Sequence, residues 1–337
     1  MKKSQFRETV PAAKKKNLPL ALVIILDLLL IGVGLVVFAM FHHVIPRDIK
    51  TSGESLPRPT TMASSTEVAT MDLTSAQETV IETTAARGAF GAKFADKFSG
   101  GAIEQTANSY VSDNINLQIS KVQANDVTYF VADIYVRDVD YLRTGFAGGN
   151  YARGITDKPL VMATENNAIL AITGDYYGIR STGIVIRNGE LYRDIPFEDT
   201  LVMNYDGTMQ TFSKAEFDIN TIKANGAWQA WSFGPMLLQD GQPMTSFNSN
   251  VTGLNPRTAI GYFEPGHYCF VTVDGRQDGY SIGMSMKQMS QLFFDLGCMV
   301  AYNLDGGQSA EMIFGGQIYN QPYNGGRNVS DIVYLAE

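Results

Sequence analysis

The stretch Ala301-Tyr302-Asn303-Leu304-Asp305-Gly306-Gly307-Gln308-Ser309-Ala310 carries the clearest structural and chemical signal in this 337-residue chain. Residues 300–304 predict a buried strand that delivers Asp305 into a turn with two glycines, and Ser309 follows this turn. Paired glycines allow backbone N–H groups to converge on an anion, and the aspartate lies beside that cradle. Taken alone the pattern is weak, because Asp-Gly-Gly also forms ordinary turns.

Three segments upstream repeat this arrangement, in which a strand ends or begins at charged residues and glycine. They read Ala171-Ile172-Thr173-Gly174-Asp175-Tyr176-Tyr177, Leu254-Asn255-Pro256-Arg257-Thr258-Ala259-Ile260-Gly261 and Thr272-Val273-Asp274-Gly275-Arg276. Guanidinium groups bind phosphate bidentately, so Arg257 and Arg276 near carboxylates suit a phosphate ester. The aromatic ring of Tyr176 suits stacking on a sugar. Each segment alone is more typical of an ordinary turn than of a site.

The pattern of strands and helices predicts an α+β fold, as a single mixed-sheet domain over residues 88–337. Aromatic and β-branched residues predict strands at 129–136, 168–173, 183–187, 257–263, 268–273 and 300–304. Asn188-Gly189 predicts a hairpin turn. One helix is expected at 285–296, where Ser285 and Gln288 form a capping box and Gly297 follows the last turn.

Residues 18–41 are apolar apart from Asp27, over 24 positions. A membrane-spanning helix needs about 20 such residues, whereas the apolar core of a cleaved signal peptide has about 7 to 15. We therefore expect a retained single-pass anchor. The carboxylate of Asp27 either contacts a partner helix or is accommodated in a protonated or snorkelling form.

The charges on either side of this anchor predict its orientation. Residues 1–17 form a basic segment with six Lys or Arg residues and one Glu, and few positive charges follow residue 41 closely. The positive-inside bias places residues 1–17 in the cytoplasm and the remainder outside the cell membrane. Residues 42–87 are rich in Ser, Thr, Pro, Glu and Ala, which predicts a stalk rather than a folded domain.

Composition excludes several classes of function. The formal net charge of −8 conceals a basic N-terminus, and the rest of the chain carries about −13, which argues against a nucleic-acid partner. Histidine is too scarce for a His-rich zinc site, and a Ser-His-Asp triad would have to use His267. The Glu-Pro-Gly context of that histidine predicts a solvated turn. Cys269 and Cys298 lie in apolar stretches, which favours free buried thiols over a disulfide.

Together, the segments resemble the phosphodiester glycosidase family. The resemblance spans about residue 110 to the end, and its order and spacing agree with the family. It rests on residues 167–177, Ser232-Phe233-Gly234-Pro235, residues 255–259, residues 273–276 and residues 303–309, with the helix at 285–296 and Gly326-Arg327-Asn328-Val329-Ser330-Asp331 as further support.

The chain departs from the family pattern in two motifs. The family's last motif usually has three glycines, two serines and a threonine, whereas Gln308, Ala310 and Glu311 replace the third glycine, the second serine and the threonine here. Its first motif usually reads Asn-Gly-Gly, where this chain has Thr-Gly-Asp at 173–175. Substrate preference therefore stays open.

The resemblance implies an extracytoplasmic hydrolase that cleaves a sugar-1-phosphodiester in cell-envelope polysaccharide or related glycans, and we expect no cofactor and no metal. Positive charge then builds at the anomeric carbon and negative charge on the departing phosphate. Asp305 or Asp274 would act as base or nucleophile, and Ser309 would orient a reacting group. The remaining roles fall to substrate-binding residues: Arg257, Arg276, Gly306 and Gly307 for the phosphate, and Asp175, Asn303 and Tyr176 for the sugar.

Two other functions stay open at this point. Asp175, Asp274 and Asp305 would suit a divalent cation, as in a metal-dependent phosphoesterase. The domain would also suit a non-catalytic glycan-binding protein of exopolysaccharide assembly. In the plainest interpretation, the Asp-Gly turns serve only the fold.

Overall fold

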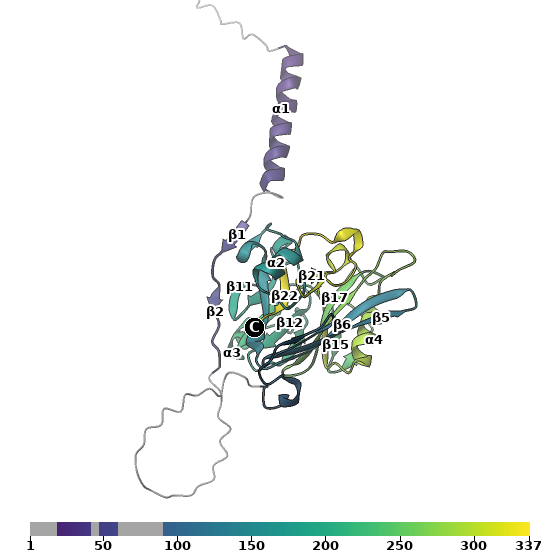
Figure 1. Cartoon of the computed structure of the whole chain (residues 1–337). Helices are drawn as coiled ribbons and strands as arrows, with labels where there is room; N and C mark the ends of the chain where they lie inside the picture. The colour runs from purple at the N-terminus through teal and green to yellow at the C-terminus, as the bar shows by residue number, and fades with distance from the viewer. Residues whose placement is uncertain (1–18, 42–46, 60–89) are drawn as a thin grey trace, which may run out of the picture. The chain divides into compact units, whose positions relative to one another are not determined.

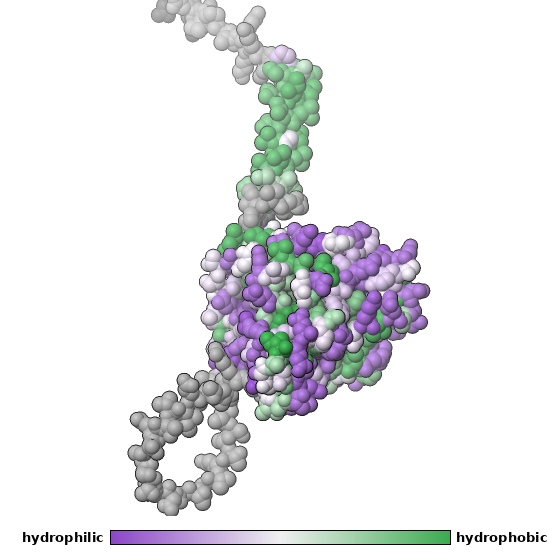
Figure 2. Space-filling view, viewed as in Figure 1, coloured by the Kyte–Doolittle hydropathy of each residue, from purple (hydrophilic) through white to green (hydrophobic). Residues whose placement is uncertain are grey.

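The computed structural model describes residues 19–41, 47–59 and 90–337, and the chain divides into two units, residues 1–46 and 47–337. In the first unit, helix α1 spans Leu20–Ala39 with a mean hydropathy of 3.0. Its described surface is apolar along its length (Figure 2). This helix is long and apolar enough to cross a membrane, in agreement with the span expected at 18–41. The basic segment 1–17 lies outside the described residues.

The second unit consists mainly of strands with a few short helices (Figure 1). Its helices are α2 (Pro159–Glu165), α3 (Ile219–Ala224) and α4 (Met286–Asp295). Its strands are β1 (Arg47–Lys50), β2 (Glu54–Ser55), β3 (Glu104–Gln105), β4 (Ser109–Val111), β5 (Ile115–Ala124), β6 (Val127–Val136), β7 (Leu142–Phe146), β8 (Tyr151–Arg153), β9 (Leu170–Thr173), β10 (Gly183–Arg187), β11 (Glu190–Ile195), β12 (Thr200–Asn204), β13 (Met209–Phe212), β14 (Ala227–Trp231), β15 (Met236–Gln239), β16 (Gln242–Pro243), β17 (Arg257–Glu264), β18 (His267–Val273), β19 (Val300–Asn303), β20 (Met312–Phe314), β21 (Gln317–Ile318) and β22 (Asp331–Leu335).

The strands form three larger sheets and one two-stranded pair. Their orders are β16-β15-β19-β17-β18-β6-β5-β4-β3, β13-β12-β14-β10-β11-β2, β21-β20-β9-β22-β7 and β1-β8. The expected α+β class is confirmed. The described strand pairs are antiparallel and divide among these sheets. Short turns suffice for antiparallel neighbours, whereas parallel strands need long crossovers.

The elements expected from the sequence are present, with small shifts at their ends. The six expected strands correspond to β6, β9, β10, β17, β18 and β19. Asn188 and Gly189 form the β10–β11 turn with φ of 52° and 79°, the left-handed values that a type I′ hairpin requires. Helix α4 begins after a capping box between Ser285 and Gln288. These local signals were sufficient to predict the elements, because each signal depends on residues that are close together in the sequence.

The three larger sheets share one hydrophobic core. Alternate residues of β5 point into it, as in Ile115, Leu117 and Ile119, since successive side chains of a strand face opposite sides. Tyr302 of β19 and Trp231 of β14 are fully buried in the same core. Packing of these strands in the core therefore fixes the positions of the polar residues at the strand ends.

Two chemically reactive residue types are part of this framework. Cys269 and Cys298 are buried and free, with their Sγ atoms 3.8 Å apart, as the sequence favoured. The expectation of a solvated His267 is wrong: it begins β18 and its Nε2 lies 2.7 Å from Asp133 Oδ1. Its ring also stacks on the rings of Tyr135 and Phe263, which together with the carboxylate hold it on the sheet.

Residues 47–59 correct the expectation of an uninterrupted stalk over 42–87. Strand β1 pairs with β8, and β2 pairs with β11 at the edge of its sheet. Leu56 is 6% exposed and packs against the same core cluster as Ile184 and Leu191. An edge strand offers unpaired backbone groups, so a neighbouring chain segment can add to it as a further strand. The rest of the expected stalk lies outside the described residues.

Replacement of Leu56 tests whether this segment is part of the folded domain. We expect Leu56→Ala to lower the free energy of unfolding by about 2–5 kcal/mol, because a buried leucine is lost. Ile49→Ala is the control, since Ile49 in β1 is 58% exposed and its removal should change stability little. Urea unfolding of the full chain in detergent, followed by the fluorescence of Trp228 and Trp231, measures both. Equally small effects would show that residues 47–59 do not contribute to the fold.

Candidate active site

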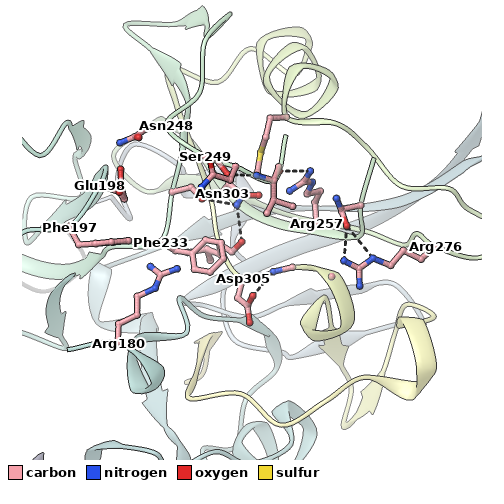
Figure 3. A pocket seen from close by; sticks show the side chains of 18 residues that line it. Arg180, Phe197, Glu198, Phe233, Asn248, Ser249, Arg257, Arg276, Asn303 and Asp305 are labelled. Carbon is pink, nitrogen blue, oxygen red and sulfur yellow. Dashed lines mark hydrogen bonds between the residues drawn. The ribbon is translucent and has the colours of Figure 1, made fainter. Parts of the chain in front are cut away.

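A pocket of about 390 Å³ lies at the ends of β17 and β19 (Figure 3). It brings together part of the set that the sequence nominated: Arg257, Arg276, Asn303, Asp305, Gly306 and Gly307. The other lining residues come mainly from the loop 248–255 and from positions 180, 197, 198 and 233. The remaining nominated residues, Asp175, Tyr176, Asp274 and Ser309, do not line the pocket.

Strand register explains why residues distant in sequence meet here. Strands β17 and β19 are antiparallel neighbours with Ala259 opposite Asn303, so continuing the register by two residues places Arg257 opposite Asp305. The chains approach closely at this point, since a Cβ on Gly306 would lie 2.7 Å from the Pro256 carbonyl oxygen. Glycine is therefore required at 306 by packing.

Asp305 is the most buried carboxylate that lines the pocket, at 5% exposure. Its Oδ1 accepts a hydrogen bond from Gly306 N at 2.9 Å, and its Oδ2 lies 3.0 Å from Arg327 Nη2. Burial raises the pKa of the Asp305 carboxyl, and the charge of Arg327 and a hydrogen bond from Ser309 oppose this shift. Arg327 Nε also donates to Ser309 Oγ. The carboxylate is thus fixed in orientation beside the pocket.

Arg257 lines the pocket at 4% exposure and forms no ion pair with a described carboxylate. Its Nε donates to Met284 O at 3.0 Å, and its Nη2 donates to Val251 O at 3.0 Å and to Gly253 O. Nη1 takes no part in these bonds. Burial, and then the charge of Arg276, lower the pKa of Arg257 to about 10. An anion in the pocket would relieve both effects.

Arg276 reaches the same pocket from a left-handed backbone position, with φ of 60°. Its Nε and Nη2 donate to Asn255 Oδ1 at 3.1 and 2.7 Å. A Cβ on Gly307 would lie 3.2 Å from Arg276 Nη2. The second glycine therefore makes room for this guanidinium.

The two glycines do not form the anion cradle that the sequence indicated. Gly306 N donates to Asp305 Oδ1 and Gly307 N donates to Pro256 O, both at 2.9 Å. Because both N–H groups already have partners, their role is close packing of the turn. The basic residues that line the pocket are Arg180, Arg257 and Arg276.

Asn303 contributes an acceptor without a partner. Its Nδ2 donates to Gly234 O at 2.9 Å and to Leu304 O at 3.0 Å. Carbonyl oxygens only accept, so these two bonds fix the orientation of the amide. Its Oδ1 is buried and accepts no hydrogen bond from the described residues. A ligand hydroxyl would satisfy this oxygen, whose isolation otherwise costs about 1–3 kcal/mol.

Asp175 belongs to a buried ionic cluster rather than to the pocket. Arg187 Nη2 lies 2.9 Å from both Asp175 Oδ1 and Asp331 Oδ2, and the three side chains are at most 1% exposed. Asp175 Oδ2 accepts a hydrogen bond from Ser232 N, and Asp331 Oδ1 accepts one from Asp175 N, both at 3.0 Å. The expected contact of Asp175 with a sugar is therefore replaced by a contact that positions the loops.

Asp274 is also fully engaged away from the pocket. Its Oδ1 accepts from Asn320 Nδ2 at 2.7 Å, and its Oδ2 accepts from Tyr280 Oη at 2.8 Å and Gln321 N at 3.0 Å. It is 1% exposed. These bonds leave it in a structural position rather than the catalytic one expected.

The three aspartates of the metal-dependent alternative do not converge. Asp175 pairs with Arg187, Asp274 with neutral donors and Asp305 with Arg327. In the described part of the chain, no group of three or more His, Cys, Asp or Glu residues could hold a metal ion. The site that this alternative requires is not formed by these residues.

The sequence did not indicate several residues that line the pocket or, as Arg327 does, contact Asp305. Arg327 and Phe233 lie within motifs that support the family resemblance, yet the sequence predicted no functional role for either residue. Tyr176, expected to stack on a sugar, instead lies under the Arg327 guanidinium at 5.0 Å. Arg180 and Phe197 lie in loops with no motif, and only the tertiary fold brings them to the pocket.

Glu311 is a buried acid behind the site, at 3% exposure. Burial raises its pKa to about 7, and a hydrogen bond from the Arg327 backbone and the charge of Lys158 oppose this shift. A Cβ on Gly326 would lie 1.7 Å from Glu311 Oε1. The acid therefore supports the segment that carries Arg327.

Glu311 predicts a pH-dependent contribution to stability. Its pKa is about 7 in the folded protein against an ordinary value of 4.5, so the folded state holds the proton more tightly than the unfolded state. The contribution is complete below about pH 4.5 and is lost as the pH rises towards and through about 7. Because Glu311→Gln removes this titration, the Tm of the wild type minus that of the variant should fall between about pH 5 and 8. A constant or rising difference would contradict the assignment.

Comparison with known proteins identifies the relatives of this domain. The sequence model of the phosphodiester glycosidase family matches residues 166–336. The SPbeta prophage-derived uncharacterized protein YomE of Bacillus subtilis (strain 168) is 33% identical over 192 residues. That match covers 53% of this chain, and the chain spans only 28% of the length of this relative.

Two solved structures share the fold. The catalytic domain of zebrafish N-acetylglucosamine-1-phosphodiester alpha-N-acetylglucosaminidase, auto-inhibited by its pro-peptide, has a TM-score of 0.53 at 22% identity, covering 66% of this chain and 83% of that chain. A hypothetical protein from Synechocystis has a TM-score of 0.52 at 15% identity, covering 66% and 62%. At these identities the likeness concerns the fold.

Proposed function

The chain belongs to the phosphodiester glycosidase family, and from this premise we propose that its pocket hydrolyses the bond between the anomeric carbon of a sugar and a phosphodiester. The family and the fold support hydrolysis of glycan phosphodiesters in general terms. The particular bond, the substrate and the residue roles are the content of the proposal.

The observation that carries the proposal is the charge arrangement of the pocket. Arg257 and Arg276 line it without a carboxylate partner among the described residues, and Arg257 is almost completely buried. A buried cation without a counter-ion is costly, so this end of the pocket favours an anionic ligand. Asp305 lines the same pocket, which supports a role for its carboxylate beside the bound anion.

In the proposed reaction, water supplies the oxygen that bonds to the anomeric carbon. The bond from that carbon to the phosphate oxygen breaks, and the phosphate departs with the electron pair. Asp305 acts either as the base that takes the proton from water or as a nucleophile that water later displaces. Ser309 orients Asp305 through the hydrogen bonds that both make with Arg327.

The other pocket residues bind the two halves of the substrate. Nη1 of Arg257 and the guanidinium of Arg276 bind the departing phosphate, whose negative charge grows in the transition state. Oδ1 of Asn303 accepts a hydrogen bond from a sugar hydroxyl. A phosphate is a good leaving group, so little proton donation to it is needed.

We further propose that α1 anchors the domain at the outer face of the cell membrane, with residues 1–17 in the cytoplasm. The length and hydropathy of α1 and the basic charges that precede it support this orientation. Sugar-phosphate polymers of the cell envelope, including exopolysaccharide, are the proposed substrate class. A glycan-binding protein without activity is the alternative, and it predicts binding without release of free sugar.

A pair of aspartate variants tests the proposed chemistry. We expect the full chain in detergent to release free sugar from a sugar-1-phosphodiester such as UDP-glucose. Asp305→Asn should lower kcat/KM by about 100-fold or more, because it removes the base or nucleophile. Asp274→Asn is the matched control: it should lower Tm by disturbing a buried hydrogen-bond network while most of kcat/KM is retained.

Circular dichroism establishes that both variants are folded before their rates are compared. Equal activity of the wild type and Asp305→Asn would remove Asp305 from the mechanism. An inert wild type that still binds the nucleotide sugar would favour the glycan-binding alternative.

A further inference from the structure

The pocket contains a third arginine that the proposed reaction does not use. The Arg180 guanidinium contacts two aromatic rings, and its Cζ lies 4.6 Å from the centroid of Phe197 and 5.0 Å from that of Phe233. All three residues line the pocket. In Figure 3, Arg180 and Arg276 lie on opposite sides of Asp305. The pocket is therefore cationic at both ends.

Arg180 is held in place but is not neutralised. Its Nη1 donates to Ser232 O at 3.2 Å, and its own carbonyl accepts from Arg193 Nη1 at 2.7 Å. It forms no ion pair with any carboxylate in the described ranges. The planar fork of the Arg180 guanidinium suits two oxygens of one anion.

One acidic residue lies at the same end of the pocket. Glu198 follows Phe197 directly and also lines the pocket, with φ of 43°. It forms no ion pair with Arg180. In Figure 3, the Glu198 side chain and the Arg180 guanidinium lie on opposite sides of Phe197. Its negative charge opposes an anion bound there, so its removal offers an independent test.

We propose that the sugar in this pocket carries a second anionic group, a phosphate or a carboxylate, and that the edge of Arg180 binds it. This rests on the proposed function, in which Arg257 and Arg276 bind the phosphodiester that is cleaved. The substrate is then a glycan unit with negative charge on both sides of the sugar, as in a poly(glycosyl phosphate) or an acidic polysaccharide. Phe197 and Phe233 make Arg180 rigid, so little side-chain entropy is lost on binding.

Two matched pairs of small ligands test this inference on the full chain in detergent. UDP-glucuronic acid differs from UDP-glucose by a carboxylate at the sugar, and the ratio of their kcat/KM values is measured. Glucose 1,6-bisphosphate differs from glucose 1-phosphate by a second phosphate, and calorimetric titration gives the ratio of their Kd values. In at least one pair, we expect the ligand with the additional carboxylate or phosphate on its sugar to be preferred by about tenfold or more. The preferred pair identifies the second group as carboxylate or phosphate.

Variants then assign the preference to Arg180. Arg180→Gln should abolish the preference, Arg180→Lys should retain part of it, and Glu198→Gln should increase it. Arg137→Gln is the matched control, because Arg137 also stacks on a phenylalanine, Phe98, at 5.3 Å and its Nε donates to a backbone carbonyl at 2.7 Å, yet it does not line the pocket. That variant should keep the full preference.

The outcomes separate this inference from the proposed function. Absence of preference in both pairs, or a preference that survives in Arg180→Gln, overturns the role of Arg180 while cleavage of UDP-glucose still supports the function. If neither nucleotide sugar is cleaved, the proposed function fails, and the titrations with the glucose phosphates still decide whether Arg180 binds a second anion.

Discussion

The buried contact of Arg187 with Asp175 and Asp331 is the interaction on which the geometry of the site depends. Through hydrogen bonds to the backbone, it fixes Ser232 and the 174–175 turn together. The carbonyl oxygen of Gly174 in turn accepts a hydrogen bond from Asp305 N at 3.0 Å. The Arg187 guanidinium thus links the loop at Ser232, the 174–175 turn and the turn at Asp305. Loss of one partner of such a buried cluster typically costs about 3–5 kcal/mol, since the remaining charges stay uncompensated.

The different partners of Asp175, Asp274 and Asp305 distinguish three aspartates whose sequence contexts are similar. Each follows a strand, yet Asp175 is neutralised by Arg187, and Asp274 is saturated by three neutral donors. Asp305 alone among them lines the pocket, where Arg327 and Ser309 hold it. A framework that engages two carboxylates internally leaves one at the pocket, which Arg180, Arg257 and Arg276 also line.

Much of the fold could be predicted from the sequence because its signals are local. The capping box at Ser285, the Asn188-Gly189 turn and the aromatic strand β6 all depend on neighbouring residues. Arg257, Arg276, Asn303 and Asp305 line one pocket, since their motifs flank three neighbouring strands, β18, β17 and β19. No single motif indicated that these residues form one site, whereas the family resemblance grouped the motifs together.

The errors have a common physical cause, which is dependence on distant partners. The sequence of an Asp-Gly turn is the same whether its carboxylate lines a pocket or accepts a hydrogen bond from a distant residue, as Asp274 does from Asn320. Residues 47–59 have the composition of a stalk, yet an available strand edge at β11 holds them. Arg180 and Phe197 occupy loops whose positions depend on the assembled sheets.

We propose that the site breaks the bond at the anomeric carbon rather than a bond to phosphorus. Hydrolysis of UDP-glucose in water enriched in the heavy oxygen isotope, followed by mass spectrometry of the phosphate-containing product, tests it directly. We expect UDP without label, because the water oxygen goes to the sugar. Label in a phosphorus-bound oxygen would contradict the account and assign the protein to the phosphoesterases.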